Sequence, residues 1–147
     1  MYQRILVPVD GSPTSNRGLA EAIAFARLTG GRLCLIHVVD DMTLALGVGA
    51  FTGKTEVVPL LREGGEEIVA AARQQVERTG VPVEVVLRDT RAGRVCDFVV
   101  EEATAWSADL IVIGTHGRRG LGRLLLGSDA EQILRLAPVP VLLVRGQ

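Results

Sequence analysis

The segment from Asp109 to Ser128 reads Asp109-Leu-Ile-Val-Ile-Gly114-Thr-His-Gly117-Arg-Arg-Gly-Leu-Gly-Arg-Leu-Leu-Leu-Gly127-Ser128. Its apolar start predicts a buried strand, and the periodic residues from Ala130 to Leu136 predict a helix. The loop between them is rich in glycine and arginine. Because such a loop between a strand and a helix start brings backbone N–H groups together, this order of elements indicates a place to hold phosphate.

The rest of the chain repeats the alternation of strand and helix. Short runs rich in Val, Ile and Leu predict strands buried on both faces, at Ile5–Val9, Leu33–Val39, Val83–Leu87, Leu110–Ile113 and Val141–Val144. Ser12, Gly30 and Gly80 mark the ends of the first two helical segments. Right-handed crossovers then give an α/β fold in a single domain over residues 1–147, an open doubly wound five-stranded parallel sheet with helices on both faces.

The composition bounds the classes of function. A net charge of -1 offers no field to recruit nucleic acid or an anionic membrane, and 3% aromatic residues are too few for base-stacking platforms. We see no signal peptide and no membrane-spanning run, so we expect a cytoplasmic protein. Cys34 and Cys96 are expected as small buried side chains in a reducing compartment. No residues have the spacing of a metal site or a nucleophile elbow, so we expect neither a protein-held metal nor catalytic residues.

Two strand ends are expected to face one crevice. In open α/β sheets, ligands bind outside the carboxyl ends of the strands, where the strand order reverses. If the first and fourth strands are neighbours there, Asp10 faces the glycine loop and accepts from a ribose hydroxyl or a base. Glycines let backbone amides approach an anion with unusual φ values, and arginines add positive charge. The residues concerned are Gly114, Gly117, Gly127, Arg118, Arg119 and Arg123.

Structural interpretations compete for several polar residues. Ser128 and Glu131 have the spacing of a capping box, in which the serine side chain caps the helix and is satisfied internally. Phosphate binding and a simple helix cap therefore stay open as alternatives for Ser128. His37 is expected as a core or strand-end residue, and Glu101 and Glu102 are expected on a solvated helix face.

One long segment breaks the alternation. Asp40–Pro59 has no clear period and is expected to be a flexible loop or a lid. It contains Gly53-Lys54-Thr55, which is similar to the end of a P-loop, but Val48 stands where the first glycine belongs. The following Glu56-Val-Val-Pro59 is a poor helix start, so we do not expect a P-loop here.

The spacing Gly114-x2-Gly117-x9-Gly127-Ser128 resembles the nucleotide-binding signature of the universal stress protein family. The likeness covers nearly the whole chain and includes Ile5-Leu-Val-Pro-Val-Asp10-Gly-Ser12, Ile36-His-Val-Val39 and Pro138-Val-Pro-Val-Leu-Leu-Val144. The resemblance implies a Rossmann-like fold of the adenine nucleotide alpha-hydrolase type that binds ATP. Mg²⁺ would then come with the nucleotide rather than from a cage of protein ligands.

The resemblance also implies roles for individual residues. The adenine would be lined, partly through backbone groups, by Pro8 or Val9 together with Val39, and the ribose would be held by Asp10. The phosphates would be held by Gly114, Gly117, Gly127 and Ser128, helped by His116, Arg118 or Arg119.

Two features depart from the family pattern. Asp129 stands where a small or apolar residue is frequent, and its carboxylate would repel phosphates unless it turns away or helps to hold a metal ion. Arg88-Asp89-Thr90 replaces a Gly-x-Pro turn after the third strand, which concerns loop shape more than the ligand.

The last strand is expected at an edge of the sheet. Pairing of Val139–Val144 with the same segment of a second copy would cover this apolar edge with twofold symmetry. The resemblance likewise implies a homodimer. The alternative is an edge that is shielded by the chain's own helices.

These expectations combine into an ATP-binding regulatory protein of the stress response that is not an enzyme, with slow ATP hydrolysis compatible with the site. Two alternatives stay open. One is a nucleotide-dependent enzyme of the same α/β class that carries out phosphoryl or nucleotidyl transfer. The other is a dimerisation module with an empty crevice.

Overall fold

A computed structural model of the chain describes residues 1–40, 57–90, 93–116 and 126–146. Strands and helices alternate along them, and the predicted order of elements is confirmed. The elements are β1 Arg4–Pro8, α1 Pro13–Thr29, β2 Arg32–Asp40, α3 Val57–Glu77, β3 Val83–Thr90, α4 Val95–Ala105, β4 Leu110–Gly114, α5 Ser128–Leu136 and β5 Val141–Val144. None of the described helices combines the length and the apolar character that a membrane span requires.

The sheet is parallel, with the strand order β3-β2-β1-β4-β5. From β1 the chain moves outward through β2 and β3, then crosses to the other side of β1 for β4 and β5. The strand order therefore reverses between β1 and β4, which confirms the expected switch point.

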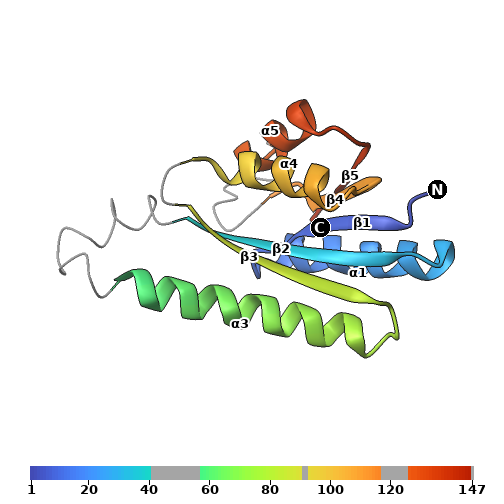
Figure 1. Cartoon of the computed structure of the whole chain (residues 1–147), viewed down its shortest axis with the longest axis horizontal. Helices are drawn as coiled ribbons and strands as arrows, with labels where there is room; N and C mark the ends of the chain where they lie inside the picture. The colour runs from blue at the N-terminus through green and yellow to red at the C-terminus, as the bar shows by residue number, and fades with distance from the viewer. Residues whose placement is uncertain (41–56, 91–92, 117–125, 147) are drawn as a thin grey trace.

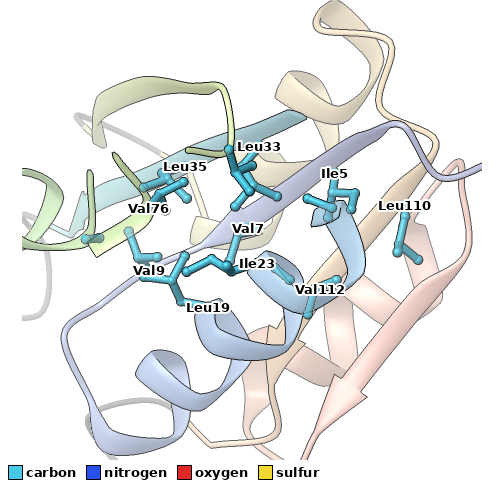
Figure 2. Close-up of a cluster of buried hydrophobic side chains, with 14 residues drawn as sticks. Ile5, Val7, Val9, Leu19, Ile23, Leu33, Leu35, Val76, Leu110 and Val112 are labelled. Carbon is cyan, nitrogen blue, oxygen red and sulfur yellow. The ribbon is translucent and has the colours of Figure 1, made fainter. Parts of the chain in front are cut away.

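Helices cover both faces of the sheet, α1 and α3 on one side and α4 and α5 on the other (Figure 1). Alternate residues of the central strands point to the two layers. Ile5 and Val7 thus pack with α1 and α3, whereas Leu6 packs with α4 and α5. In Figure 2, β1 side chains meet Leu19 of α1, and Val76 of α3 lies beside β2. The predicted doubly wound core is confirmed.

The helix boundaries confirm one prediction and correct another. Ser12 caps α1, because its Oγ accepts from the N–H of Ser15 at 3.2 Å, and Gly30 ends this helix with a left-handed φ of 69°. The interpretation of residues 56–59 as a poor helix start is wrong, since α3 begins at Val57. Pro59 lies in its first turn, where an N–H has no intrahelical acceptor and its loss costs little.

The third strand is longer than predicted. It continues past Leu87 to Thr90, and Arg88 lies opposite Val38 in the ladder with β2. Charged side chains at Arg88 and Asp89 interrupt the apolar run, so the apolar pattern ends before the strand does. Arg88-Asp89-Thr90 therefore forms strand rather than a turn.

Glu102 is not part of a solvated face, and the expectation is wrong for this residue. Only 7% of it is exposed, and its Oε2 accepts from Arg88 Nη2 at 2.9 Å. This hydrogen bond raises the pKa of Arg88. Glu101 is exposed, as predicted. The ion pair fastens α4 to β3.

Both cysteines are buried and unpaired, as expected for small core side chains. Burial raises the pKa of the Cys34 thiol to about 12 and also raises that of Cys96. Such thiols are poor nucleophiles at neutral pH, so the structure gives them a packing role.

Candidate functional site

The carboxyl ends of β1 and β4 part from each other. The pairing of these strands ends at Leu6 and Ile111, although β1 runs to Pro8 and β4 to Gly114. On its other side, β1 stays paired with β2 as far as Pro8. A crevice at a switch point is where open α/β sheets bind their ligands. The residues that follow these two strands are therefore the candidates for binding.

Asp10 lies directly after β1 and is half-buried. Its Oδ1 accepts from the N–H of Ser12 at 2.8 Å, and its own N–H donates to Ser15 Oγ at 3.1 Å. A carboxylate that bonds its own turn two residues on is a stable way to form such a turn. The side chain of Asp10 thus occupies a defined place at the carboxyl end of β1.

Two valines form an apolar part of this edge. Val9 follows β1 and Val39 lies in β2, and each is 4% exposed. Pro8 is half-buried. The backbone of Val9 is engaged, because its N–H donates to Ile36 and its carbonyl accepts from His37. The carbonyl of Val39 accepts from Thr90 Oγ1 at 3.0 Å. These two residues therefore contribute apolar side chains and a rigid backbone.

Gly114 is required by the packing of α1. A Cβ on this residue would lie 2.8 Å from the carbonyl carbon of Thr14, and a Cβ on Gly18 would lie 3.2 Å from the Gly114 nitrogen. The first turns of α1 thus rest directly on the end of β4. Gly114 has no positive φ, so the expectation of an unusual φ is wrong for this glycine.

The start of α5 differs from the predicted capping box. Gly127 is the N-cap residue with φ -60° and ψ 146°, and it makes no side-chain cap hydrogen bond. Ser128 is already the first helical residue, and the N–H of Glu131 donates to the carbonyl of Gly127 at 2.9 Å. The capping box is therefore wrong, as is the unusual φ expected for Gly127.

This helix start is fixed beside the end of β4. The N–H of Gly127 donates to the carbonyl of Thr115 at 2.7 Å, and the N–H of Thr115 donates to Val144 of β5 at 2.9 Å. Ser128 and Asp129 in the first turn are exposed. Since the N-cap residue Gly127 has no side chain that could cap α5, the positive end of the helix dipole makes this helix start a candidate site for an anion.

His116 adds a buried polar atom for which the described residues offer no partner. Its Nδ1 lies 2.9 Å from Thr115 Oγ1, whereas its Nε2 is buried and has no hydrogen-bond partner in the described part of the chain. A buried polar atom of this kind calls for an explanation, and a bound ligand is one. Gly117, Arg118, Arg119 and Arg123 lie outside the described residues, as do 41–56 with Gly53-Lys54-Thr55.

A sequence profile for the universal stress protein family matches residues 1–145. The chain belongs to this family. A universal stress protein of Thermus aquaticus is 37% identical over 145 residues, which make up 99% of this chain and 100% of that protein. The family assignment thus rests on the whole length of the chain, as the resemblance in the glycine loop predicted.

Solved structures of universal stress proteins share this fold. The structure of MJ0577 of Methanocaldococcus jannaschii has a TM-score of 0.86 and 28% identity, with 100% of this chain and 98% of that chain covered. A universal stress protein of Archaeoglobus fulgidus in complex with dAMP has a TM-score of 0.68 and 25% identity, with 97% and 98% covered. The second of these relatives was solved with an adenine nucleotide bound.

Sequence reasoning gave no role at this edge to Ser15 and Thr90, and it placed His37 without a partner. His37 is 8% exposed and lies inside β2, which confirms it as a core residue rather than a strand-end residue. One signal was available for this histidine. It follows Leu33 and Leu35 on the same face of β2. A polar side chain in this otherwise apolar series of core positions indicates a specific hydrogen bond.

Proposed function

We propose that this universal stress protein binds ATP in the crevice between the carboxyl ends of β1 and β4 and acts as a regulatory module of the stress response. The observation that carries the proposal is the hydrogen bond from Gly127 N–H to the Thr115 carbonyl at 2.7 Å. It fixes the start of α5 at the end of β4, on the other side of the switch point from β1 and Asp10. The relative from Archaeoglobus fulgidus in complex with dAMP supports an adenine nucleotide as the ligand.

Each part of the nucleotide has a matching group in this proposal. Pro8 or Val9, together with Val39, would line the adenine, partly through backbone groups, and Asp10 would accept from the ribose hydroxyls. The amides at Ser128 would bind phosphate oxygens, because a helix start offers unpaired N–H donors and a positive dipole end. The buried Nε2 of His116 would gain a partner on the same phosphates.

Asp129 bears on the affinity of this site. It is exposed in the first turn of α5, where a carboxylate stabilises the helix but repels a phosphate. No described group of His, Cys, Asp and Glu side chains is arranged to hold a metal ion. Mg²⁺ would therefore come with ATP and reduce this repulsion.

The proposed role is regulatory rather than catalytic. Asp10, a titratable group at the crevice, already accepts from Ser12, and its carboxylate is assigned to the ribose. Slow hydrolysis needs only an oriented water beside the phosphates and is compatible with this arrangement. A cytoplasmic location is also part of the proposal, supported by two cysteines that remain unpaired thiols.

A homodimer through β5 is a further part of the proposal. This strand lies at one edge of the sheet, and its residues are only partly buried. Leu134 and Leu136 of the preceding helix are each 46% exposed. Pairing of Val139–Val144 with a second copy would cover an apolar edge that is otherwise prone to aggregation. Size-exclusion chromatography with light scattering tests this pairing, and a monomer at micromolar concentration would contradict it.

The nucleotide is tested by denaturing the purified protein and identifying any released nucleotide by chromatography, followed by titration of the nucleotide-free protein with ATP and Mg²⁺. We expect ATP to bind and Asp10→Asn to weaken it by about tenfold, because one charge-assisted hydrogen bond is lost. Asparagine retains the oxygen that accepts from Ser12. Asp109→Asn, at the opposite end of the sheet, is the matched control and should bind as the wild type does. A wild-type protein that shows no binding at millimolar ATP would refute the proposal.

A further inference from the structure

The peptide bond between Val9 and Asp10 lies where β1 leaves the sheet. The pairing with β2 ends at Pro8 and Ile36, and the N–H of Val9 then donates to the Ile36 carbonyl at 2.9 Å. The next peptide group consists of the Val9 carbonyl and the Asp10 N–H. Because this peptide group lies past the paired part of β1, its carbonyl oxygen and its N–H need hydrogen-bond partners other than the backbone of a neighbouring strand.

Two buried side chains supply these partners. His37 Nδ1 lies 2.6 Å from the carbonyl oxygen of Val9, and since a carbonyl can only accept, the imidazole donates. The N–H of Asp10 donates to Ser15 Oγ at 3.1 Å. His37 and Ser15 are 8% and 5% exposed. One peptide plane is thus held from β2 at its carbonyl and from α1 at its amide.

The carboxylate of Asp10 is tied to the same turn. The N–H of Ser12 donates to Asp10 Oδ1 at 2.8 Å, and the N–H of Ser15 donates to Ser12 Oγ at 3.2 Å. These bonds link the peptide plane, the carboxylate and the cap of α1. The direction of the Asp10 side chain is therefore set before a ligand arrives, which lowers the ordering cost of binding.

Helix α3 confines the imidazole from another side. A Cβ on Gly65 would lie 3.0 Å from Cδ2 of His37 and 3.0 Å from Cγ2 of Val39. Glycine at this position lets the backbone of α3 approach the ring closely. The ring thus has little room to turn away from the Val9 carbonyl.

We propose that His37 and Ser15 are positioning residues that fix the Val9–Asp10 peptide plane and so present the carboxylate of Asp10 to the ribose of a bound nucleotide. This inference rests on the proposed function. It adds the two residues on which the contact between Asp10 and the ribose depends. Leucines occupy the two preceding core positions on this face of β2, at 33 and 35. What histidine adds at position 37 is a hydrogen-bond donor.

Two substitutions at one position separate the donor from the packing. In His37→Asn the side-chain N–H branches from the same carbon as Nδ1 and can still reach the Val9 carbonyl, whereas His37→Leu has no donor. Both variants lose the ring and should lose similar stability. We expect His37→Leu to weaken ATP binding by about tenfold and His37→Asn by no more than about threefold. If affinity instead falls equally in both variants, the role is only structural and the proposal is overturned.

Ser15 gives an independent arm of the test. Ser15→Ala removes the acceptor of the Asp10 N–H and should weaken ATP binding by about tenfold, like His37→Leu. Thr29→Val is the matched control, because it removes a part-buried hydroxyl at the opposite end of the sheet. This hydroxyl donates to the carbonyls of Tyr2 and Phe25. It should leave the affinity unchanged. Wild-type affinity in Ser15→Ala would overturn the proposal.

A measurement without nucleotide distinguishes the two proposals. Hydrogen exchange of the Asp10 amide should be faster in His37→Leu and Ser15→Ala than in the wild type, with no ATP present. Variants that exchange faster and bind more weakly support the positioning role. Variants that bind normally overturn it while the ATP site stands. Wild-type protein that does not bind ATP overturns the proposed function, and with it the role of these residues in binding.

Discussion

The two ends of the central strands β1 and β4 are stabilised in different ways. At the amino end, Asp109 accepts from the N–H groups of Gln3 and Arg4, each at 2.9 Å, and so bridges the two strands. Arg4 donates to the Trp106 carbonyl and lies over the indole ring, 4.3 Å from its centroid. At the carboxyl end the strands part, and the Val9–Asp10 peptide is held by side chains from β2 and α1.

The difference separates an end where the strands are bridged from the end that we propose binds a ligand. The carboxylate at the amino end is used to join two strands. At the carboxyl end, Asp10 is oriented by its own turn, the N-cap residue of α5 is a glycine without a capping side chain, and His116 Nε2 has no partner among the described residues. Polar groups thus join the two strands at the amino end, whereas at the carboxyl end they surround the site that we propose for a ligand.

The largest expected effect concerns the contact that closes α1 onto β4. Gly114→Ala would place a Cβ 2.8 Å from the Thr14 backbone, which cannot yield like a side chain. We expect a loss of about 3 kcal/mol in the free energy of unfolding, measured by urea denaturation. Gly64→Ala is the control, since a Cβ there has no neighbour within 4 Å and should stabilise α3 by about 0.5–1 kcal/mol. Wild-type stability in Gly114→Ala would show that the contact is not as tight as described.

The bridge at the amino end should matter for stability alone. Asp109→Ala removes the acceptor of two backbone N–H groups, and we expect a loss of about 2 kcal/mol in the free energy of unfolding. The affinity for ATP should not change. Denaturation and calorimetric titration of the same sample check both statements, and a weakened affinity would break the contrast between the two ends.

Local patterns predicted most of the fold. Apolar runs located the five strands, and Ser12 with Pro13 marked the start of α1, because both signals depend on neighbours in sequence. The contact of Arg88 with Glu102 was hidden, since it joins β3 to α4 across the fold. Charged residues in a strand and on a helix were therefore taken for solvent-exposed segments.

The candidate site was predicted less completely for the same reason. Asp10 and the glycine loop stay predictions from their spacing, whereas the switch point between β1 and β4 is confirmed. The cap at Ser128 failed because Gly127 can start the helix through its carbonyl without any side chain. Gly114 was explained by ligand approach alone, since its contact with Thr14 is formed by packing of distant elements.

A smaller effect is expected midway between the two ends, at Cys34 in β2. Burial raises the pKa of this thiol from 9.0 to about 12, so its neutral form is favoured in the folded state. That contribution to stability is complete below about pH 9 and is lost as the pH rises toward 12. We expect Cys34→Ala to reduce the alkaline loss by about 1 kcal/mol at pH 10, measured by urea denaturation at pH 7 and pH 10. Equal losses in both proteins would contradict the assignment.

The smallest effect concerns the charge beside the proposed phosphates. Asp129→Asn removes a carboxylate from the first turn of α5, so ATP affinity should rise by about twofold at low salt and less at high salt. Glu67→Gln on the exposed face of α3 is the charge-matched control and should not change the affinity. An unchanged or lower affinity in Asp129→Asn would show that this carboxylate does not repel the ligand.

One measurement tests most directly whether the carboxyl end is the binding end. Amide chemical shifts of labelled protein are recorded during a titration with ATP and Mg²⁺. We predict the largest changes at Asp10, Val39, Gly114, Gly127 and Ser128, and none beyond error at Gln3, Arg4, Trp106 and Ser107. Changes centred on the amino-end residues, or no changes at millimolar ATP, would contradict the account.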